Sequence, residues 1–557
     1  MAKDKNVPVP DSLGRLPMTR RTLIATPAAM LFAHAVQAQE KPGAAKAPKG
    51  QIVAGLTQEP TVFNPLMPRI ETDQGVQFSL FNPLWRVEPD GSFVPELAVE
   101  VPTLENGGIS PDGLVWKIKL RKGVKWHDGV EFTAEDVKYT LELVNNPSFK
   151  AYTRQGHALV RDITVHGPHE LSWKMTKLYA PYISLLTSTF IVPRHALEKA
   201  ADPNTAPFNS APIGTGPFKW GKRVAGESIT LLANTDYFGD GPYVERIIFR
   251  YIPDLNVAYT QFKTGQVDYL GYQGIASQYY KEAQTLADRK VYVAQTAQIE
   301  GLILNFGRPI FQDKAVRRAM YFGLNKKALV DLVYYGIPVE SESFLSRSSW
   351  AYNPSLPKHV YDLAAGNKAL DEAGWVKGAD GVRSKGGLRL EFTVSTVSGN
   401  SQREQILQLV QQDWRKMGIA VQIKAMPAAV IFGEYYTQSQ FDCMLGASTY
   451  GTGADPDPTQ RFSSSAIPVQ GGSGTNFYQY KNPEVDRLLQ VGQTTFKQTE
   501  RKEAYQRIQS VIREELVILP ICQPAQVEGT KAKLVGFRAN PNVSSNCWNM
   551  GSWRWAG

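Results

Sequence analysis

The sequence is poor in the residues on which catalysis and metal binding most often depend. Among its 557 residues are seven histidines and three cysteines. It contains no His-Glu-x-x-His zinc motif, no Gly-x-Ser-x-Gly nucleophile elbow, no P-loop and no Cys-x-x-Cys pair. Its one close histidine pair, His166 and His169, is separated by Gly-Pro, which is typical of a surface loop. The sequence therefore argues against an enzyme, a metal site and a bound cofactor.

Two short segments look like catalytic loops but lack the residues that catalysis needs. Residues 214–218 (GTGPF) have the glycines of a phosphate-binding loop, yet Pro217 removes a backbone N–H that a phosphate would use. Asp455 and Asp457 are neighbouring carboxylates, but a catalytic pair must face each other across a substrate. We interpret the first segment as a structural turn and the second as a loop stiffened by prolines. An exported hydrolase, the remaining enzymatic alternative, would need a catalytic constellation that we do not find.

Long apolar runs and clustered charge are also missing. The body of the chain has no run of 18 or more apolar residues, so no membrane-spanning helix is expected. The formal net charge is +9, but the basic residues are scattered, which argues against a nucleic-acid partner. With 43% hydrophobic and 20% charged residues the composition is that of a globular protein, and its length predicts more than one domain.

The N-terminus has the features of an export signal. Two arginines within residues 19–24 precede a modestly apolar stretch that ends in a small-x-small cleavage site at residues 36–38. Residues 1–38 are therefore predicted to be a signal peptide that is cleaved near Ala38. The paired arginines are typical of a twin-arginine (Tat) signal, and an ordinary Sec signal with two adjacent basic residues is an equal alternative. Met18 is an alternative start.

The residues after the predicted cleavage site indicate whether the mature protein is anchored or free. Residues 39–50, rich in Lys, Ala and Pro, are predicted to be a disordered leader. No cysteine follows the cleavage site, so we expect no lipid anchor and a protein that is free in a bacterial periplasm. In an exported chain Cys522 and Cys547 can pair, whereas Cys443 lies in an apolar run typical of a buried, inert thiol.

The clearest secondary-structure unit is a strand–helix–strand unit. Residues 388–395 alternate as a strand does, residues 401–417 carry apolar side chains at helical spacing, and residues 419–425 form a second strand. Such a unit implies parallel strands joined by a right-handed crossover. Further helices are expected over 313–333 and 484–515. The fold class is therefore α/β with mixed sheets.

The segment from Trp116 to Val137 is the most informative part of the chain. Residues 116–121 alternate apolar and basic side chains, which predicts a half-buried strand. Asp128-Gly129 supplies a tight turn, because glycine tolerates the positive φ that such turns need. Thr133 follows as a helix N-cap, with Asp136 at the third helical position, where a capping box places an acid. The residues predict a strand, a hairpin and a capped helix.

This segment also resembles the signature segment of the family 5 (peptide, nickel and opine type) solute-binding proteins of ABC importers. Short motifs in matching order extend the resemblance from about residue 51 to about residue 522; they lie at 95–98, 214–218, 304–305, 316–319, 372–375 and 482–486. The resemblance implies a two-lobed α/β periplasmic-binding-protein fold of type II (cluster C), with an additional subdomain inserted in lobe I. Its implied parts are lobe I at 51–86, 196–297 and 521–557, the inserted subdomain at 87–195, and lobe II at 298–520.

The resemblance also implies where a ligand would lie. In this family it lies in the cleft between the lobes, and peptide-binding members hold an extended ligand as an added β-strand. Two matching edges continue the predicted strands at 51–56 and 441–446. The implied ligand-binding residues are Thr57, Gln58 and Glu59 in lobe I and Ser448, Thr449, Tyr450, Thr452 and Asp455 in lobe II. Ordinary strand-end loops are the alternative interpretation of both segments.

The chain departs from the family pattern at the charges that grip a dipeptide. The acid that precedes Asp-Pro-Asp in dipeptide-binding members has no counterpart in residues 450–454, and their arginine has none in residues 395–400; Arg403 lies already within the predicted helix. Each missing charged contact would forfeit roughly 1.5–3 kcal/mol. A longer peptide, an opine or a sugar conjugate is therefore favoured over a dipeptide. Nickel–histidine is disfavoured because no histidine follows His359.

Together these features predict a periplasmic substrate-binding component of an ABC importer that captures a peptide, peptide-like or opine-like solute in an interlobe cleft. Its expected partners are this ligand and the permease subunits of the inner membrane, and we expect a monomer. The alternative is a periplasmic sensor or chaperone subunit on the same fold, with no transport role, because fold does not determine function.

Overall fold

The computed structural model describes residues 47–271 and 274–557, which belong to one compact unit. The predicted signal peptide (1–38) and the first part of the predicted leader (39–46) lie outside the described residues. At the end of the leader, Lys49 N–H donates to the Tyr243 carbonyl at 3.0 Å, and the Gly50 carbonyl accepts from Glu245 N–H at 2.9 Å. The chain is thus joined to the folded unit from Lys49 onward.

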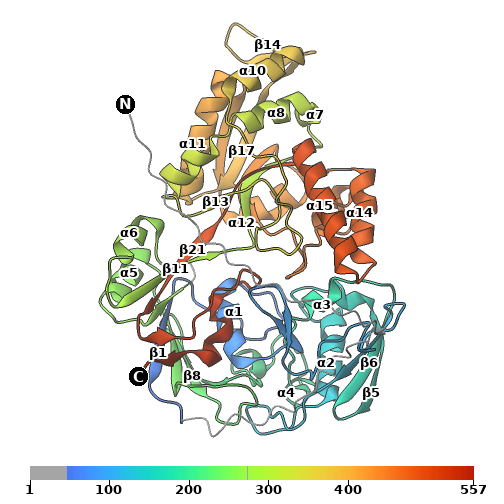
Figure 1. Cartoon of the computed structure of the whole chain (residues 1–557), viewed down its shortest axis with the longest axis vertical. Helices are drawn as coiled ribbons and strands as arrows, with labels where there is room; N and C mark the ends of the chain where they lie inside the picture. The colour runs from blue at the N-terminus through green and yellow to red at the C-terminus, as the bar shows by residue number, and fades with distance from the viewer. Residues whose placement is uncertain (1–46, 272–273) are drawn as a thin grey trace, which may run out of the picture. The chain divides into compact units, whose positions relative to one another are not determined.

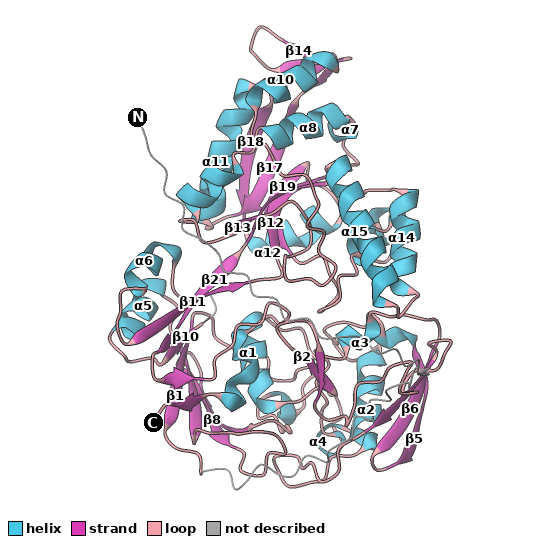
Figure 2. Ribbon diagram, viewed as in Figure 1, coloured by secondary structure: helices cyan, strands magenta, loops and turns pink. Residues whose placement is uncertain are grey.

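A seven-stranded sheet forms the centre of one lobe (Figures 1 and 2). Its order is β11 (Arg289–Gln295), β21 (Ala525–Lys531), β10 (Tyr269–Leu270), β1 (Gln51–Leu56), β9 (Arg246–Tyr251), β8 (Ser228–Ala233) and β7 (Phe218–Val224). β1 is parallel to both of its neighbours, whereas β21 is antiparallel to β10 and β11. The strand expected over residues 51–56 is confirmed.

A six-stranded sheet forms the centre of the other lobe. Its order is β13 (Val339–Glu340), β20 (Ile518–Gln523), β12 (Ile299–Leu304), β19 (Cys443–Ser448), β17 (Glu391–Val397) and β18 (Ala420–Met426). β17 is parallel to β18 in full register and to β19 over a short stretch, whereas β12 is antiparallel to β19 and β20. The predicted parallel strand–helix–strand unit is confirmed, with α11 (Ser401–Lys416) as its helix and Gly418 at φ +79° after it.

The chain passes between the two sheets twice, at neighbouring positions. β11 continues into β12 through residues 296–298, and β20 continues into β21 through Pro524. Thr296 joins the two crossings, because its N–H and its hydroxyl both donate to the Pro524 carbonyl at 3.1 Å. The lobe boundaries expected at 298 and 520 remain predictions.

A three-stranded sheet in the order β4 (Val115–Lys119), β6 (Glu170–Met175), β5 (Val160–Gly167) lies within residues 87–195. It contains the signature segment, and its predicted strand, turn and helix are present: Gly129 has φ +91°, and α2 (Ala134–Asn145) begins after Thr133. Asp136 accepts the Thr133 N–H at 2.9 Å and the Arg194 N–H at 2.9 Å. One buried carboxylate therefore closes the capping box and ties α2 to the first residue of α4 (Arg194–Leu197).

Two predicted helices are shorter than expected. The helix expected over 313–333 ends at Phe322 and resumes at Lys326, because Gly323 closes the first piece and the Asn325 side chain caps the second. The helix expected over 484–515 is two helices, α14 (Pro483–Gln493) and α15 (Gln498–Glu515), packed on each other with Gly492 against Tyr505. Helical periodicity on both sides of each break concealed the interruption.

The other helices of eight or more residues flank the sheets. They are α1 (Glu71–Leu80), α5 (Leu255–Lys263), α8 (Lys314–Phe322) and α10 (Leu363–Glu372). Within the described residues, no helix is both long enough and apolar enough to cross a membrane.

The three cysteines are buried free thiols. Cys522 lies in β20, whereas Cys547 follows Ser545 near Tyr269, so the possible Cys522–Cys547 disulfide is not formed. Cys522 is in the six-stranded sheet, whereas Cys547 lies in a 3₁₀ helix (Asn546–Ser552) beside Tyr269 of the seven-stranded sheet, a separation that sequence spacing alone cannot reveal. Cys443 is fully buried, as expected.

Candidate functional site

The candidate site lies where β17 and β19 separate. β19 pairs with β12 along its whole length, from Cys443 to Ser448, but it pairs with β17 only at Cys443 and Met444. β17 instead continues beside β18 to Val397. A pocket of about 330 Å³ opens between the diverging strands. It lies at the carboxyl ends of parallel strands, where open α/β sheets commonly bind ligands.

The pocket is lined by both apolar and polar residues. The apolar residues are Val397, Ile431, Phe432, Met444 and Leu445, and the others are Tyr436, Gly446, Ala447, Ser448, Thr449 and Arg461. Ile431 and Phe432 belong to a single π-helical turn (Ile431–Tyr435) that follows α12 (Ala428–Val430) and forms one wall. This wall is held to the sheet by a hydrogen bond of 2.6 Å between the hydroxyls of Ser395 and Tyr435. Phe432 leaves half of its side chain exposed beside the pocket.

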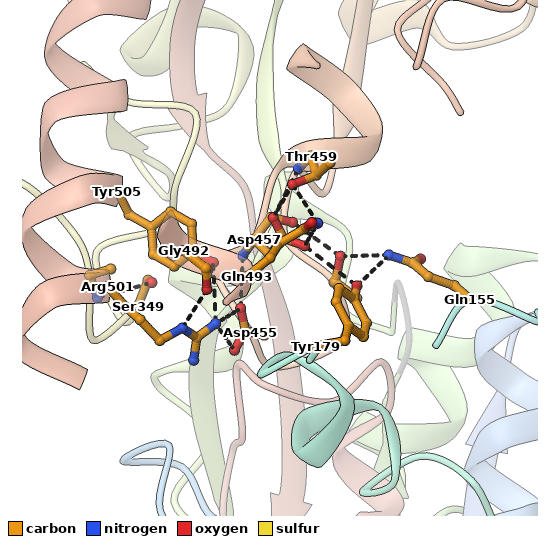
Figure 3. A network of polar contacts seen from close by, with 12 residues as sticks. Gln155, Tyr179, Ser349, Asp455, Asp457, Thr459, Gly492, Gln493, Arg501 and Tyr505 are labelled. Carbon is orange, nitrogen blue, oxygen red and sulfur yellow. Dashed lines mark hydrogen bonds and ion pairs between the residues drawn. The ribbon is translucent and has the colours of Figure 1, made fainter. Parts of the chain in front are cut away.

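Behind the pocket, the Asp-Pro-Asp loop is anchored by a buried ion pair (Figure 3). Arg501 Nη2 lies 2.7 Å from both carboxylate oxygens of Asp455, and its Nε donates to the Gly492 carbonyl at 2.7 Å. Thr452 and Asp455 are further joined by two backbone hydrogen bonds. The loop is therefore fixed to α14 and α15 rather than free to move with a ligand.

Asp457 is the second buried carboxylate of this loop. Burial and then the charge of Asp455 raise its pKa to about 6, although hydrogen bonds from Thr459 and Gln493 lower it. Gln493 Nε2 donates to Asp457 Oδ2 at 3.0 Å. These partners occupy the carboxylate from within its own lobe and leave it no exposed face for acid–base chemistry.

The loop also contacts the inserted segment of residues 87–195 (Figure 3). The Gln155 side-chain amide donates to Thr452 Oγ1 at 3.2 Å and to the Tyr179 hydroxyl at 3.0 Å. The Tyr179 hydroxyl lies 3.4 Å from Asp457 Oδ2. Burial is the main cause of the raised pKa of Tyr179, with the charge of Asp457 adding to it. The loop beside the pocket is thus linked by polar contacts to two segments of the chain.

The predicted lobe II residues divide into two groups. Ser448 and Thr449 line the pocket, whereas Tyr450, Thr452 and Asp455 are buried behind it. Tyr450 is stacked on the Phe462 ring at a centroid distance of 5.6 Å. A role for the buried three in contacting a ligand remains a prediction, and their observed contacts support the loop.

The predicted lobe I residues do not line this pocket. Thr57 is buried and Gln58 is exposed. Glu59 accepts from Arg223 Nη2 at 2.6 Å and from Gly226 N–H at 2.9 Å, and these two partners lower its pKa, Gly226 being the larger cause. Their role in ligand binding also remains a prediction.

The structure changes which arginine is available to a ligand. Arg403, which lies close to the position of a family ligand residue, is neutralised by Glu300, with Nε and Nη2 at 2.7 and 2.9 Å from its two oxygens. Arg461, which sequence reasoning did not single out, lines the pocket. Its only sequence signal is its place four residues after Asp457, and Tyr436 gave no signal at all.

Two α/β lobes joined by adjacent crossing strands, with a pocket at strand ends, define a solute-binding protein of the two-lobed periplasmic type. The chain belongs to family 5 of the bacterial extracellular solute-binding proteins, since the model of the middle region of that family matches residues 92–469. The resemblance inferred from the sequence is thereby confirmed.

Individual relatives share both sequence and fold with the chain. It is 28% identical over 512 residues to the oligopeptide-binding protein AppA of Bacillus subtilis (strain 168), covering 90% of this chain and 91% of that protein. The structure of AppA in complex with a nonapeptide has a TM-score of 0.76 at 27% identity and covers 92% of this chain and 100% of its own. NikZ from Campylobacter jejuni in complex with Ni(L-His) has the same TM-score and identity, with coverages of 91% and 99%.

Proposed function

We propose that the chain is the periplasmic substrate-binding component of an ABC importer and that its solute is an extended peptide or a peptide-like molecule. One observation carries the choice of solute. β19 has a strand partner on its β12 side as far as Ser448 but, in the described residues, has β17 beside it only as far as Met444. An extended peptide can complete the sheet there through main-chain hydrogen bonds that do not depend on its side chains.

Two observations bear on the size of the solute: the charged residues that grip a dipeptide in other family members are missing, and solved relatives contain known ligands. Neither residues 450–454 nor 395–400 carry a charge, and Arg403 is already paired with Glu300. The structure of AppA, which contains a nonapeptide, supports a peptide longer than two residues. The complex of NikZ with Ni(L-His) is the competing precedent. No histidine is among the residues that line the described pocket, which favours the peptide.

Transport would follow from a ligand that contacts both lobes. Such a ligand shifts the equilibrium between an open and a closed arrangement of the lobes only to the extent that it binds the closed one more tightly. In this proposal the pocket beside Ser448 and Thr449 binds the solute, Thr57–Glu59 contact it from lobe I, and the loaded protein docks on a membrane permease. Export by the predicted signal peptide places the protein in the periplasm.

The test is the melting temperature of the mature protein after unfolding and refolding, which removes any ligand carried through purification. Di- to pentapeptides, opines, sugars and nickel–histidine are compared. A ligand at about 100 times its dissociation constant adds about 2.7 kcal/mol of stability. Stabilisation by tri- to pentapeptides is expected. A response to an opine, a sugar or nickel–histidine alone would overturn the peptide assignment.

A peptide that binds as an added strand must also depend on its own backbone N–H groups. N-methylation of one amide at a time in a bound pentapeptide is expected to weaken binding at alternate residues, because a strand directs successive N–H groups to opposite sides. Uniform tolerance of N-methylation would exclude the strand mode. Isothermal titration of each methylated peptide measures the effect.

A further inference from the structure

Arg461 differs from the buried arginines of the same lobe in having no carboxylate partner among the described residues. The three most buried ones are each within ion-pair distance of an acid, namely Arg317 with Glu515, Arg383 with Asp371 and Arg501 with Asp455. For Arg461, no acidic side chain in the described part of the chain lies within that distance, and its pKa is governed by burial and by three tyrosines. Because Arg461 lines the pocket and has no carboxylate partner among the described residues, its guanidinium can pair with an anionic group of a bound solute.

The groups that act on the charge of Arg461 are three tyrosines, whose hydroxyls can both donate and accept hydrogen bonds. Burial lowers the pKa of Arg461, but electrostatic interactions with Tyr478, Tyr436 and Tyr450 and a hydrogen bond to Tyr478 raise it overall. The hydroxyls of Tyr436 and Tyr478 are buried and have no partner at ordinary hydrogen-bond length and angle, although both interact with the Arg461 guanidinium. Tyr436 is about nine-tenths buried and lines the pocket together with Arg461. A guanidinium beside two phenolic O–H groups offers several donors and no negative charge, which is the chemistry that holds a carboxylate.

The rest of the pocket determines what can carry that carboxylate. Its volume of about 330 Å³ is at the lower end of the usual range of ligand pockets. Val397, Ile431 and Met444 contribute apolar surface to the same pocket that Arg461 and Tyr436 line. This combination can accommodate a carboxylate on a short aliphatic side chain of a peptide whose main chain lies along β19.

We propose that this pocket is a binding site for a carboxylate of the solute, held by Arg461 and Tyr436; if that carboxylate belongs to a side chain, the protein prefers acidic peptides. The inference rests on the proposed function, since it assigns the solute class of the same site. The carboxylate comes either from an acidic side chain or from the peptide C-terminus, and both would present the same group to Arg461.

The experiment compares two pentapeptides, Ala-Ala-Glu-Ala-Ala and Ala-Ala-Gln-Ala-Ala, each with a free and an amidated C-terminus, by isothermal titration against ligand-stripped protein. Wild type is expected to prefer a peptide with the recognised carboxylate by about tenfold or more, since one charge-assisted contact contributes about 1.5–3 kcal/mol. A loss on Glu-to-Gln exchange assigns the side chain, and a loss on amidation assigns the C-terminus. Equal affinities for all four peptides would overturn the proposal.

The variant R461Q is expected to remove this preference while changing affinity for the neutral, amidated peptide by less than about threefold. The matched control is R415Q, because Arg415 is exposed on α11 and its loss changes the net charge equally. R415Q should behave as wild type. R461K keeps the positive charge but lacks the planar, bidentate guanidinium, so it should retain part of the preference for the carboxylate. It provides a second test if R461Q folds poorly. An unchanged preference in both R461 variants would overturn the proposal.

Failure of the peptide assignment can be told apart from failure of the carboxylate site. If no peptide binds wild type, N-acetylglutamate and N-acetylglutamine at millimolar concentration are compared by melting temperature. Stabilisation of wild type but not of R461Q by the acid alone would keep the carboxylate site and remove only the peptide. No stabilisation by either compound would overturn both proposals.

Discussion

Arg501 Nη2 lies at the same distance, 2.7 Å, from both carboxylate oxygens of Asp455, and both side chains are almost fully buried. This pair is the structural centre of the loop behind the pocket (Figure 3). Asp455 Oδ1 also accepts the Asp457 N–H at 3.0 Å. The acid that sequence reasoning placed at the ligand therefore has its acceptor positions occupied by the protein, and its measurable effect should be on stability.

We expect R501M to lower the free energy of unfolding by about 3–5 kcal/mol, because it leaves the Asp455 charge buried and unpaired. The matched control is R507M on the same helix, where Arg507 Nε lies 2.7 Å from Glu484 Oε1 but both side chains are largely exposed. An exposed pair contributes about 0–1 kcal/mol. Urea denaturation of both variants measures the difference. Equal losses would contradict the assigned role of burial.

Asp457 should make stability depend on pH in the direction opposite to most carboxylates. Its pKa is raised from 3.8 to about 6, by burial first and by Asp455 second. Between these values the folded protein holds a proton that the unfolded chain has released, so this group lowers stability as pH rises from about 4 to about 6 and contributes little further change above that. The neighbouring charged groups are Asp455 and Arg501.

The variant D457N isolates this contribution, because asparagine does not titrate. The difference in free energy of unfolding, wild type minus D457N, is expected to fall by about 2–3 kcal/mol between pH 4 and pH 6. Urea denaturation at pH 4, 5, 6 and 7 measures it. D90N serves as a control, since Asp90 is fully exposed and its pKa is lowered by Ser92. A difference that is flat or rises with pH would show that Asp457 is charged in the folded state.

Gly214 should not tolerate a side chain. A Cβ at this position would lie 1.7 Å from the Leu80 carbonyl oxygen, and Gly214 exchanges two hydrogen bonds with His127, its N–H donating to Nδ1 and its carbonyl accepting the His127 N–H. G214A is expected to cost at least the 1–3 kcal/mol typical of overpacking. G167A is the control, because a Cβ there meets no atom within 4 Å, and it should stay within about 0.5 kcal/mol of wild type. Similar thermal stability of the two variants would contradict the close approach.

The three thiols should not react with a thiol reagent in the native protein. Burial raises the pKa of Cys547 to about 12 and is also the main cause of the raised pKa values of Cys443 and Cys522. Ellman's reagent at pH 8 is expected to detect no thiol in the folded protein and three after denaturation without reductant. Detection of a single thiol after denaturation would demonstrate a disulfide and contradict the separation of Cys522 from Cys547.

Local patterns in the sequence predicted much of the fold. The alternation in β17 and β18 and the helical spacing in α11 determine those elements within a few residues, and the cap of α2 follows from Thr133 and Asp136. The breaks at Gly323 and after Gln493 were missed because periodicity continues on both sides of each break. Local propensity is a weak guide to whether two helical stretches are joined.

The pocket was only partly predictable. Ser448 and Thr449 were found because they continue a recognisable strand. Arg461 and Tyr436 were not, since they come from separate segments whose meeting depends on tertiary packing, and neither has a periodic or motif signal. In sequence, an isolated arginine in a polar stretch is indistinguishable from a solvated one. Arg461 is set apart only by its place in the pocket and by the absence of an acid within ion-pair distance in the part of the chain that the structure describes.

The position of β21 determines the order in which the molecule can be completed. β21 lies between β10 and β11, although it is built from residues 525–531, whereas every strand of the six-stranded sheet has been synthesised by residue 523. The seven-stranded sheet contains β1, the first strand of the chain, but it cannot be completed until β21, near the end of the chain, has left the ribosome. Until then β11 has no neighbour in its sheet, and a chain that stops before residue 525 would leave β10 and β11 unjoined.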